Sequence, residues 1–444
     1  MIVTALAVLG LGGVALLALD LFAEGYLPLL RTVAFAVLVA AGLLLLGGTG
    51  VPAFAGTSLV DDTMARLLGA LAAFAAALAV LLPPPLGDAA DRKQRGAGYL
   101  ALLAWATAGM VLLAAAGDLL TLFLGLELLS LALYALTAYG VSGPGGEAAL
   151  KYFLLGGLGS GLVLYGGALV FAGSGRLNFL SQAVSGGPLV TAGLALLLAG
   201  LAFKLALMPF HLWTPDVYEG APTGVTAFMA VGTKAAAFAA LAHLLLAGFP
   251  QSEPIWAPLL IVIAVASLLL GYALAAPQRG IKRLLAYSSI ANAGTAALAL
   301  LLGVHAGSVL ILYLYTYAVA TFGAFACVAA TGGDLVGLRY RWPWLGGAML
   351  LFLLSLASVP LTAGFAGKLV LLLGLMQGGR GVLAILVIVS TVIGLYPYFK
   401  VARLAIQPAE AEPAGVAWGP AAVVAACVVA TLALGLWPAL LPGA

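Results

Sequence analysis

Long apolar runs of about 20 residues recur along the whole chain, separated by short polar segments. A transmembrane helix needs about 20 apolar residues to cross the hydrocarbon core of a bilayer, so runs of this length predict membrane spans. The runs are continuous rather than alternating, which excludes outer-membrane β-strands. The pattern therefore predicts an all-α polytopic membrane protein of about 14 transmembrane helices, at residues 2–22, 28–48, 63–82, 98–117, 118–141, 147–172, 189–214, 221–248, 254–276, 283–303, 305–331, 345–376, 380–405 and 415–440.

Composition agrees with this pattern, because 64% of the residues are hydrophobic and only 7% are charged. No connection between the predicted spans is long enough to form a soluble domain, so we expect residues 1–444 to form a single membrane domain. Within it the pattern predicts four parts: helices 1–3 (1–97), a first repeat (98–248), a second repeat (254–405) and a C-terminal helix (415–440).

The 18 Lys and Arg residues are divided unevenly between the two sides of the predicted bundle. Eleven lie in odd-numbered connections between spans, three lie in or beside even-numbered connections, and four lie inside spans. Positive charge marks the cytoplasmic side of a membrane protein. The odd-numbered connections should therefore face the cytoplasm, and both termini should face the outside.

Two predicted spans, helices 7 and 12, contain residues that interrupt a helix. Helix 7 has Pro209 five residues after Lys204, and helix 12 has Pro360 and two glycines shortly before Lys368. Such interruptions are tolerated inside a membrane only where protein or water satisfies the freed backbone groups. Two broken spans five helices apart fit the inverted repeats of ion transporters, with helices 4–8 and 9–13 as the units. Two unrelated kinks are the alternative.

Four lysines lie inside predicted spans, namely Lys151, Lys204, Lys234 and Lys368, and Glu127 is the acid in the middle of a span. A lysine at bilayer depth costs roughly 2.5–3.5 kcal/mol on insertion scales. Such residues usually mark an ion or proton pathway. Arginine stays charged under nearly all conditions, whereas a desolvated lysine loses its proton readily. The use of lysine at every embedded cationic position therefore predicts groups that gain and release protons.

Glu127 and Lys204 can be interpreted in two ways. A change in the distance between them would change how strongly the lysine holds its proton. A purely structural salt bridge is the alternative, although it leaves Lys234 and Lys368 without an acidic partner in the middle of a span. Lys151 lies four residues after Glu147, so an ion pair along one helix and a functional role are both open.

Two histidines are candidate proton relays. His211 lies at the predicted cytoplasmic end of helix 7, close in sequence to Asp216 and Glu219, where a local turn network is the alternative. His243 lies in the outer half of helix 8 and is either a relay or a packed polar residue. The three histidines show no metal-ligand spacing, so no metal site is expected.

The chain shows no motif for a cofactor of its own. Its two cysteines are far apart, and no CxxC pair, phosphate-binding loop or dinucleotide fingerprint is present. We therefore expect no cofactor in this chain, and any electron transfer would take place elsewhere. The net charge of +3 is too small to indicate a nucleic-acid partner.

Three motifs resemble a known family. They are PFHLWTPDVYEGAPTGVTAF (209–228), KRLLAYSSIANAG (282–294) and LTAGFAGKLVLL (361–372). Together with the 14-span layout they resemble the antiporter-like membrane-arm subunits of bacterial respiratory complex I, the NADH:quinone oxidoreductase. The DVYEGAP portion is similar to that of the subunit N group. The resemblance covers essentially the whole chain.

The resemblance implies a non-redox, proton-translocating subunit in the bacterial inner membrane, driven by quinone reduction in other subunits. The family's buried charged residues fall on Glu127, Lys204, Lys234 and Lys368, and its helix-6 lysine falls on Lys151. Flavin, iron–sulfur clusters and quinone would be bound by partner subunits. The expected neighbours are subunits M, K and J and the long lateral helix of subunit L. Asn292 stands where this family often has a histidine.

Two other functions compete with this one. An Mrp-type cation/proton antiporter subunit would need carboxylate-rich cation sites, but Glu127 is the only acid in the middle of a predicted span. A structural membrane scaffold would use its lysines only to pair with other subunits. Replacing Lys204 by Met should then leave proton translocation intact.

Overall fold

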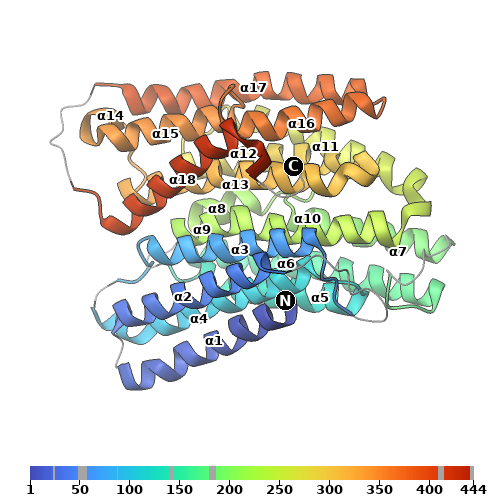
Figure 1. The fold of residues 1–444 in the computed structure, drawn as a ribbon, viewed down its shortest axis with the longest axis horizontal. Coiled ribbons are helices and arrows are strands. Elements are labelled where there is room, and N and C mark those ends of the chain that lie inside the picture. Colours follow the sequence, from blue (N-terminus) through green and yellow to red (C-terminus); the bar gives the residue numbers. More distant parts are fainter. Residues whose placement is uncertain are drawn as a thin grey trace.

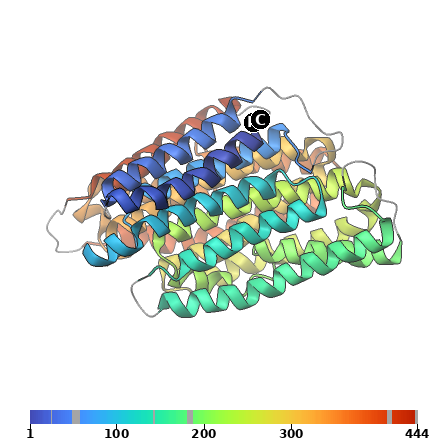
Figure 2. The ribbon, with the colours of Figure 1, turned by 90° about the horizontal axis from the view of Figure 1, so that it is seen from below.

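The computed structural model describes residues 1–23, 26–48, 58–87, 89–140, 144–179, 187–408 and 415–440. Its long elements are helices that run roughly side by side along the longest axis of the molecule (Figures 1 and 2). The predicted all-α polytopic fold is confirmed.

The first half of the chain contains seven long helices followed by a segmented one. Their order is α1 (Ile2–Ala23), α2 (Leu27–Leu46), α3 (Thr63–Leu81), α4 (Ala89–Ala114), α5 (Leu119–Thr137), α6 (Pro144–Ser174), α7 (Pro188–Lys204), α8 (Thr214–Gly220), α9 (Thr223–Phe228), the π-helical η1 (Met229–Thr233), α10 (Lys234–Ala242) and the π-helical η2 (His243–Gly248). Side-chain caps begin two of these helices, because Asp62 accepts a hydrogen bond from the N–H of Ala65 and Asp118 accepts one from Thr121.

The second half repeats the same kind of arrangement. It contains the 3₁₀ turn η3 (Pro250–Ser252), α11 (Glu253–Ala275), α12 (Ile281–Ala297), the 3₁₀ segment η4 (Leu298–His305), α13 (Ala306–Thr331), α14 (Leu338–Arg341), α15 (Pro343–Leu356), α16 (Ala363–Gln377), α17 (Gly381–Ile406), α18 (Trp418–Leu436) and the 3₁₀ turn η5 (Pro438–Leu440).

Among the described residues, eleven helical segments are long and apolar enough to cross a membrane. One of them is a run of 51 residues that contains α12, η4 and α13, and α7, α15 and α16 are shorter apolar helices. Each predicted span overlaps one of these helices, but the exact count of 14 stays a prediction. Among the helix starts, that of α4 differs most, because α4 begins at Ala89, nine residues before the predicted span 98–117. The predicted division after residue 97 therefore falls inside a helix.

Both predicted breaks are present. α7 ends at Lys204 and α15 ends at Leu356, and the chain becomes helical again only at Thr214 and at Ala363. Pro209 lies inside the first break and Pro360 inside the second, as the sequence predicts. The two glycines after Pro360, however, lie within α16, so they do not form the break.

The two breaks end their helices in the same way. After α7, Ala206 has a positive φ of 59° and the next N–H, that of Leu207, donates to the carbonyl five residues back at 2.9 Å. After α15, Ser358 has a φ of 59° and the N–H of Val359 makes the corresponding bond at 3.0 Å. This is the Schellman type of helix end. Matching ends are what an internal repeat would produce, while the repeat units themselves stay a prediction.

Side chains satisfy backbone N–H groups that the breaks release. The N–H of Met208 donates to Oγ of Ser267 in α11 at 2.8 Å, and the N–H of Gly364 donates to Oγ of Ser355 at 3.0 Å. Within a bilayer such groups must find partners inside the protein. The first and last described helices, α1 and α18, have their free ends at the same end of the bundle (Figure 1).

Candidate functional site

Lys204, the last residue of α7, is buried between three helices with 2% of its surface exposed. Its ammonium donates to Oγ of Ser130 in α5 at 2.9 Å and to the hydroxyl of Tyr152 in α6 at 3.1 Å. Both partners are neutral groups that can either accept or donate a hydrogen bond. The lysine is therefore held at the first break by hydroxyls rather than by a carboxylate.

Close packing of glycines brings these helices together. A Cβ atom on Gly200 of α7 would lie 2.8 Å from the carbonyl oxygen of Gly159 in α6, and one on Gly156 would overlap the hydroxyl of Tyr134 in α5. A larger residue at these positions would push the helices apart. The glycines thus set the distance across which Lys204 reaches its partners.

Glu127 does not form an ion pair with Lys204 in the described structure. It lies three residues before Ser130 on the same face of α5, and its Oε1 is buried without a hydrogen-bond partner among the described residues. The alternative of a structural salt bridge is therefore not supported. Glu127 and Lys204 instead interact electrostatically without a direct bond, while Ser130, one helical turn after Glu127, contacts the lysine.

Lys234, the first residue of α10, is equally buried and is held by α12. Its ammonium donates to the backbone carbonyl of Ser289 at 2.9 Å and also makes a short hydrogen bond to Oγ of the same serine. That hydroxyl is bonded in turn to the hydroxyl of Tyr317 in α13 at 2.7 Å. Tyr218 of α8 lies close to the Ser289 side chain. Ser289 therefore joins the lysine to Tyr317.

Lys368 of α16 is 4% exposed and donates to Oγ1 of Thr391 in α17 at 3.2 Å. It lines a small cavity with Tyr317 and Asn292, of about 10 Å³, close to the space that one water molecule needs. Asn292 is fixed in place, because the Tyr313 hydroxyl donates to its Oδ1 and its Nδ2 donates to a backbone carbonyl of α12. Tyr317 and this cavity thus lie between Ser289 and Lys368.

Aromatic side chains occupy the space between Lys204 and Lys234. Tyr152 stacks on Trp213 with ring centroids 4.5 Å apart, and Trp213 packs edge-on against Tyr218 at 6.3 Å. Trp213 is anchored by a hydrogen bond from its indole N–H to the carbonyl of Phe203. Tyr152, at one end of this row, accepts a hydrogen bond from Lys204, and Tyr218, at the other end, lies close to Ser289. The broken segment after α7 therefore connects the first lysine to the second.

Lys151 lies outside this buried row. It is half exposed and pairs with Glu147 at 2.8 Å and with Asp216 of α8 at 2.9 Å. Arg283 of α12 also pairs with Asp216 and with Glu219. These ion pairs tie α6, α8 and α12 together, which favours the structural interpretation of Lys151.

The two candidate relay histidines have different surroundings. His211 does not pair with Asp216 or Glu219, and its Nδ1 is buried without a partner among the described residues. His243 of η2 contacts Oδ2 of Asp62, the capping residue of α3, through its Nε2 at 3.0 Å. His243 therefore joins the end of predicted helix 8 to a capped helix end at the bundle surface. The relay role of each histidine stays a prediction.

Comparison with known proteins gives the family. Residues 116–394, which include Glu127, Lys204, Lys234 and Lys368, match the family model described as NADH:quinone oxidoreductase/Mrp antiporter, transmembrane. This chain belongs to that family. It is 40% identical to NADH-quinone oxidoreductase subunit N 1 of Symbiobacterium thermophilum, over 86% of this chain and 83% of the relative. It is 37% identical to subunit N of Trichlorobacter lovleyi, over 98% and 93% of the two chains.

Solved structures of the family have the same fold. A chain of respiratory complex I from Thermus thermophilus superposes with a TM-score of 0.85 at 38% identity, and the match covers 98% of each chain. A chain of the Mrp complex of a Dietzia species reaches the same TM-score at 23% identity, over 98% of this chain and 94% of that one, which shows a shared fold alone. Within the family this chain is therefore a homologue of subunit N, an antiporter-like membrane subunit, as the motifs at 209–228, 282–294 and 361–372 predict.

Sequence reasoning found the buried lysines but missed what holds them. Ser130, Ser289, Tyr317 and Thr391 were not expected, since each belongs to a different helix from the lysine that it serves. The sequence did contain a feature that could have pointed to Ser289. This serine lies in the KRLLAYSSIANAG motif, three residues before Asn292.

Proposed function

We propose that this chain translocates protons as an antiporter-like subunit of an NADH:quinone oxidoreductase, without a redox centre of its own. Lys204, Lys234 and Lys368 would hold the protons at mid-membrane, and the charge of Glu127 would modulate Lys204. Moving one charge against 100 mV costs about 2.3 kcal/mol. Coupled changes in the protonation of a few buried groups can supply energy of that size.

One observation carries this proposal: three buried lysines each bond to a neutral hydroxyl, and the last two are joined by a hydroxyl pair and a cavity of about one water. A hydroxyl can accept a proton on one side while it releases its own on the other. The order Lys234, Ser289, Tyr317, water and Lys368 would then be a lateral proton path.

The redox centres of the NADH:quinone oxidoreductase would belong to other subunits. Flavin, iron–sulfur clusters and quinone would be bound there, and this chain would contact subunits M, K and J and the lateral helix of subunit L. The distribution of Lys and Arg supports an orientation with both termini on the outer side of a bacterial inner membrane. His211 and Lys151 would then lie toward the cytoplasm, and His243 toward the outside.

The test is replacement of Lys204 by Met in the complete respiratory complex, measured in sealed inverted membrane vesicles. We expect assembly to be retained and NADH-driven proton uptake to be lost. Lys93→Met makes the same chemical change at an exposed lysine and should leave proton uptake unchanged. Normal pumping by the Lys204 variant would support a scaffold role and overturn the proposal.

The same vesicles distinguish the Mrp-type alternative. A cation/proton antiporter subunit should give proton movement that depends on an added sodium gradient and continues when NADH oxidation is blocked. We expect proton movement that stops with NADH oxidation and does not respond to sodium.

A further inference from the structure

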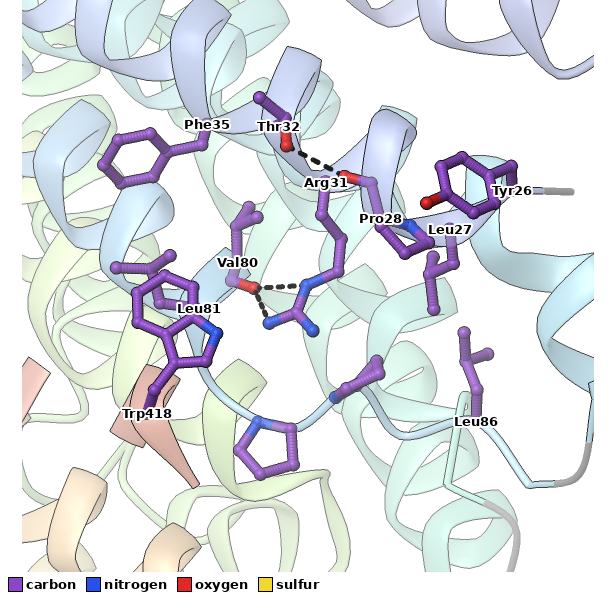
Figure 3. A pocket seen from close by; sticks show the side chains of 12 residues that line it. Tyr26, Leu27, Pro28, Arg31, Thr32, Phe35, Val80, Leu81, Leu86 and Trp418 are labelled. Atoms are coloured by element: carbon purple, nitrogen blue, oxygen red, sulfur yellow. Dashed lines mark hydrogen bonds between the residues drawn. The ribbon is translucent and has the colours of Figure 1, made fainter. Parts of the chain in front are cut away.

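A wide cleft of about 1040 Å³ opens between the start of α2, the end of α3 and the start of α18 (Figure 3). Its wall is largely apolar, and Arg31 is the charged residue among those that line it. Neither the lysine row nor the ion pairs described above include any residue of this cleft. Its function is therefore separate from the proposed proton path.

Arg31 is held so that one nitrogen of its guanidinium, Nη1, stays available. Its Nε and Nη2 both donate to the carbonyl of Val80, at 3.0 and 2.6 Å, and Nη2 also donates to that of Leu82 at 3.2 Å. These carbonyls lie at the end of α3, where three prolines follow and the helix cannot continue. Nη1 bonds to none of the described residues and faces the ring of lining side chains (Figure 3).

The position of the cleft matches the interface between lipid head groups and acyl chains. Arg31 is four residues into α2, about 6 Å from the helix start at a rise of about 1.5 Å per residue. Tyr26 and Trp418 also line the cleft, and both are strongly exposed, at 62% and 74%. Tyrosine and tryptophan gather at this depth in membrane proteins. The apolar wall below them includes Leu27 and Phe35.

We propose that this cleft binds one anionic phospholipid, with its phosphate on Arg31 and an acyl chain against the apolar wall. Basic pockets between transmembrane helices are suited to anionic head groups. Nη1 still offers its two N–H groups, and hydrogen bonds from a charged guanidinium to phosphate oxygens are roughly twice as strong as neutral ones. A single guanidinium at the mouth of an apolar cleft complements a molecule that carries an anionic head and an apolar tail together.

Binding there would stabilise a contact between distant parts of the chain. Gly419 at the start of α18 packs so closely on α3 that a Cβ atom would overlap the carbonyl oxygen of Leu81. A lipid in the cleft would touch both of these helices and α2. It would therefore hold the N-terminal helices against α18.

The test is native mass spectrometry of the full-length chain in detergent, titrated with phosphatidylglycerol or phosphatidylcholine. We expect tighter binding of phosphatidylglycerol, and a loss of about tenfold in its affinity in Arg31→Gln. Arg279→Gln is the matched control, because it removes one exposed arginine that lies outside the cleft. Equal affinity of Arg31→Gln and the wild type for phosphatidylglycerol would overturn the proposal, as would displacement of the lipid by inorganic phosphate alone.

A second measurement does not depend on Arg31, which also holds the end of α3. A photoactivatable phosphatidylglycerol added to the intact complex should label the segments 26–35, 80–86 or Trp418. Trp418→Ala should reduce this labelling several-fold, and Trp437→Ala, a similarly exposed tryptophan at the other end of α18, should not. Absence of labelling, or cross-linking of these segments to a neighbouring subunit instead, would show that a protein helix covers the cleft.

Discussion

Ser289 offers the sharpest test of the lateral proton path. Its hydroxyl accepts a hydrogen bond from the buried ammonium of Lys234 and is bonded to Tyr317. Ser288, the neighbouring residue, is also buried and also bonds to a tyrosine, Tyr398, but it contacts no lysine. Ser289→Ala and Ser288→Ala therefore remove the same atom from adjacent positions, and only the first interrupts the path.

The size of the effect follows from the contacts. A hydrogen bond to a charged group is worth about 1.5–3 kcal/mol, and a neutral one about 0.5–1.5 kcal/mol. Each 1.4 kcal/mol corresponds to about tenfold in a rate. Ser289→Ala should therefore slow proton passage between Lys234 and Lys368 by about 10- to 100-fold. Ser288→Ala should slow it by less than about tenfold, since a neutral contact alone is lost.

The assay is NADH-driven acidification of inverted vesicles, measured beside NADH:quinone activity with an uncoupler present. We expect Ser289→Ala to slow acidification by this factor while the uncoupled activity remains. Tyr317→Phe separates the two contacts of Ser289, because it keeps the bond from Lys234 and breaks the link to the cavity. Acidification at the wild-type rate in both variants would refute the path through Ser289.

Three further predictions concern the fold. Gly364→Ala should destabilise the chain by about 1–3 kcal/mol, because the new Cβ would lie 1.9 Å from a carbonyl oxygen of α15. Gly347→Ala is the control, since a Cβ atom there has open space, and thermal unfolding in detergent compares the two variants. Ser267→Ala should cost about 1–3 kcal/mol, because it leaves a buried backbone N–H of the first break unpaired; an unchanged melting temperature would contradict this. Burial raises the pKa of Asp62, but hydrogen bonds from His243 and a backbone N–H outweigh this and hold it below its usual 3.8. The contribution of Asp62 to stability is thus present above pH 3.8 and is lost as the pH falls through the lower pKa of the folded state. In that acidic range the free energy of unfolding of the wild type should fall more steeply with pH than that of Asp62→Asn.

Much of the fold could be predicted because its causes are local in the sequence. Apolar runs gave the spans, and the prolines at 209 and 360 gave the two breaks. The start of α4 was placed too late because charged residues were taken to mark a loop. Asp91 and Arg95 instead pair one helical turn apart, which allows α4 to continue beyond the apolar run.

The partners of the lysines could not be predicted from local pattern. A serine or threonine inside an apolar helix gives no sign of the side chain that reaches it, since that depends on which helix faces meet. The positive φ angles of Ala206 and Ser358 could not be predicted from the sequence for a related reason. Such angles usually belong to glycine, so these helix ends depend on the surrounding packing rather than on the residue itself.

The difference between Lys151 and the buried lysines explains why similar residues would take different roles. Lys151 is paired with two carboxylates, whose negative charges stabilise its ammonium form, so loss of its proton would remove the positive charge that both of them face. Lys204, Lys234 and Lys368 are each bonded to a hydroxyl, which accepts from an ammonium and can rotate to donate to a neutral amine. Both protonation states of the buried lysines therefore keep a partner. A carboxylate introduced beside one of them, as in Ser289→Asp, should fix its charge and block acidification as completely as removal of the lysine, and retained acidification in that variant would show that a neutral partner is not required.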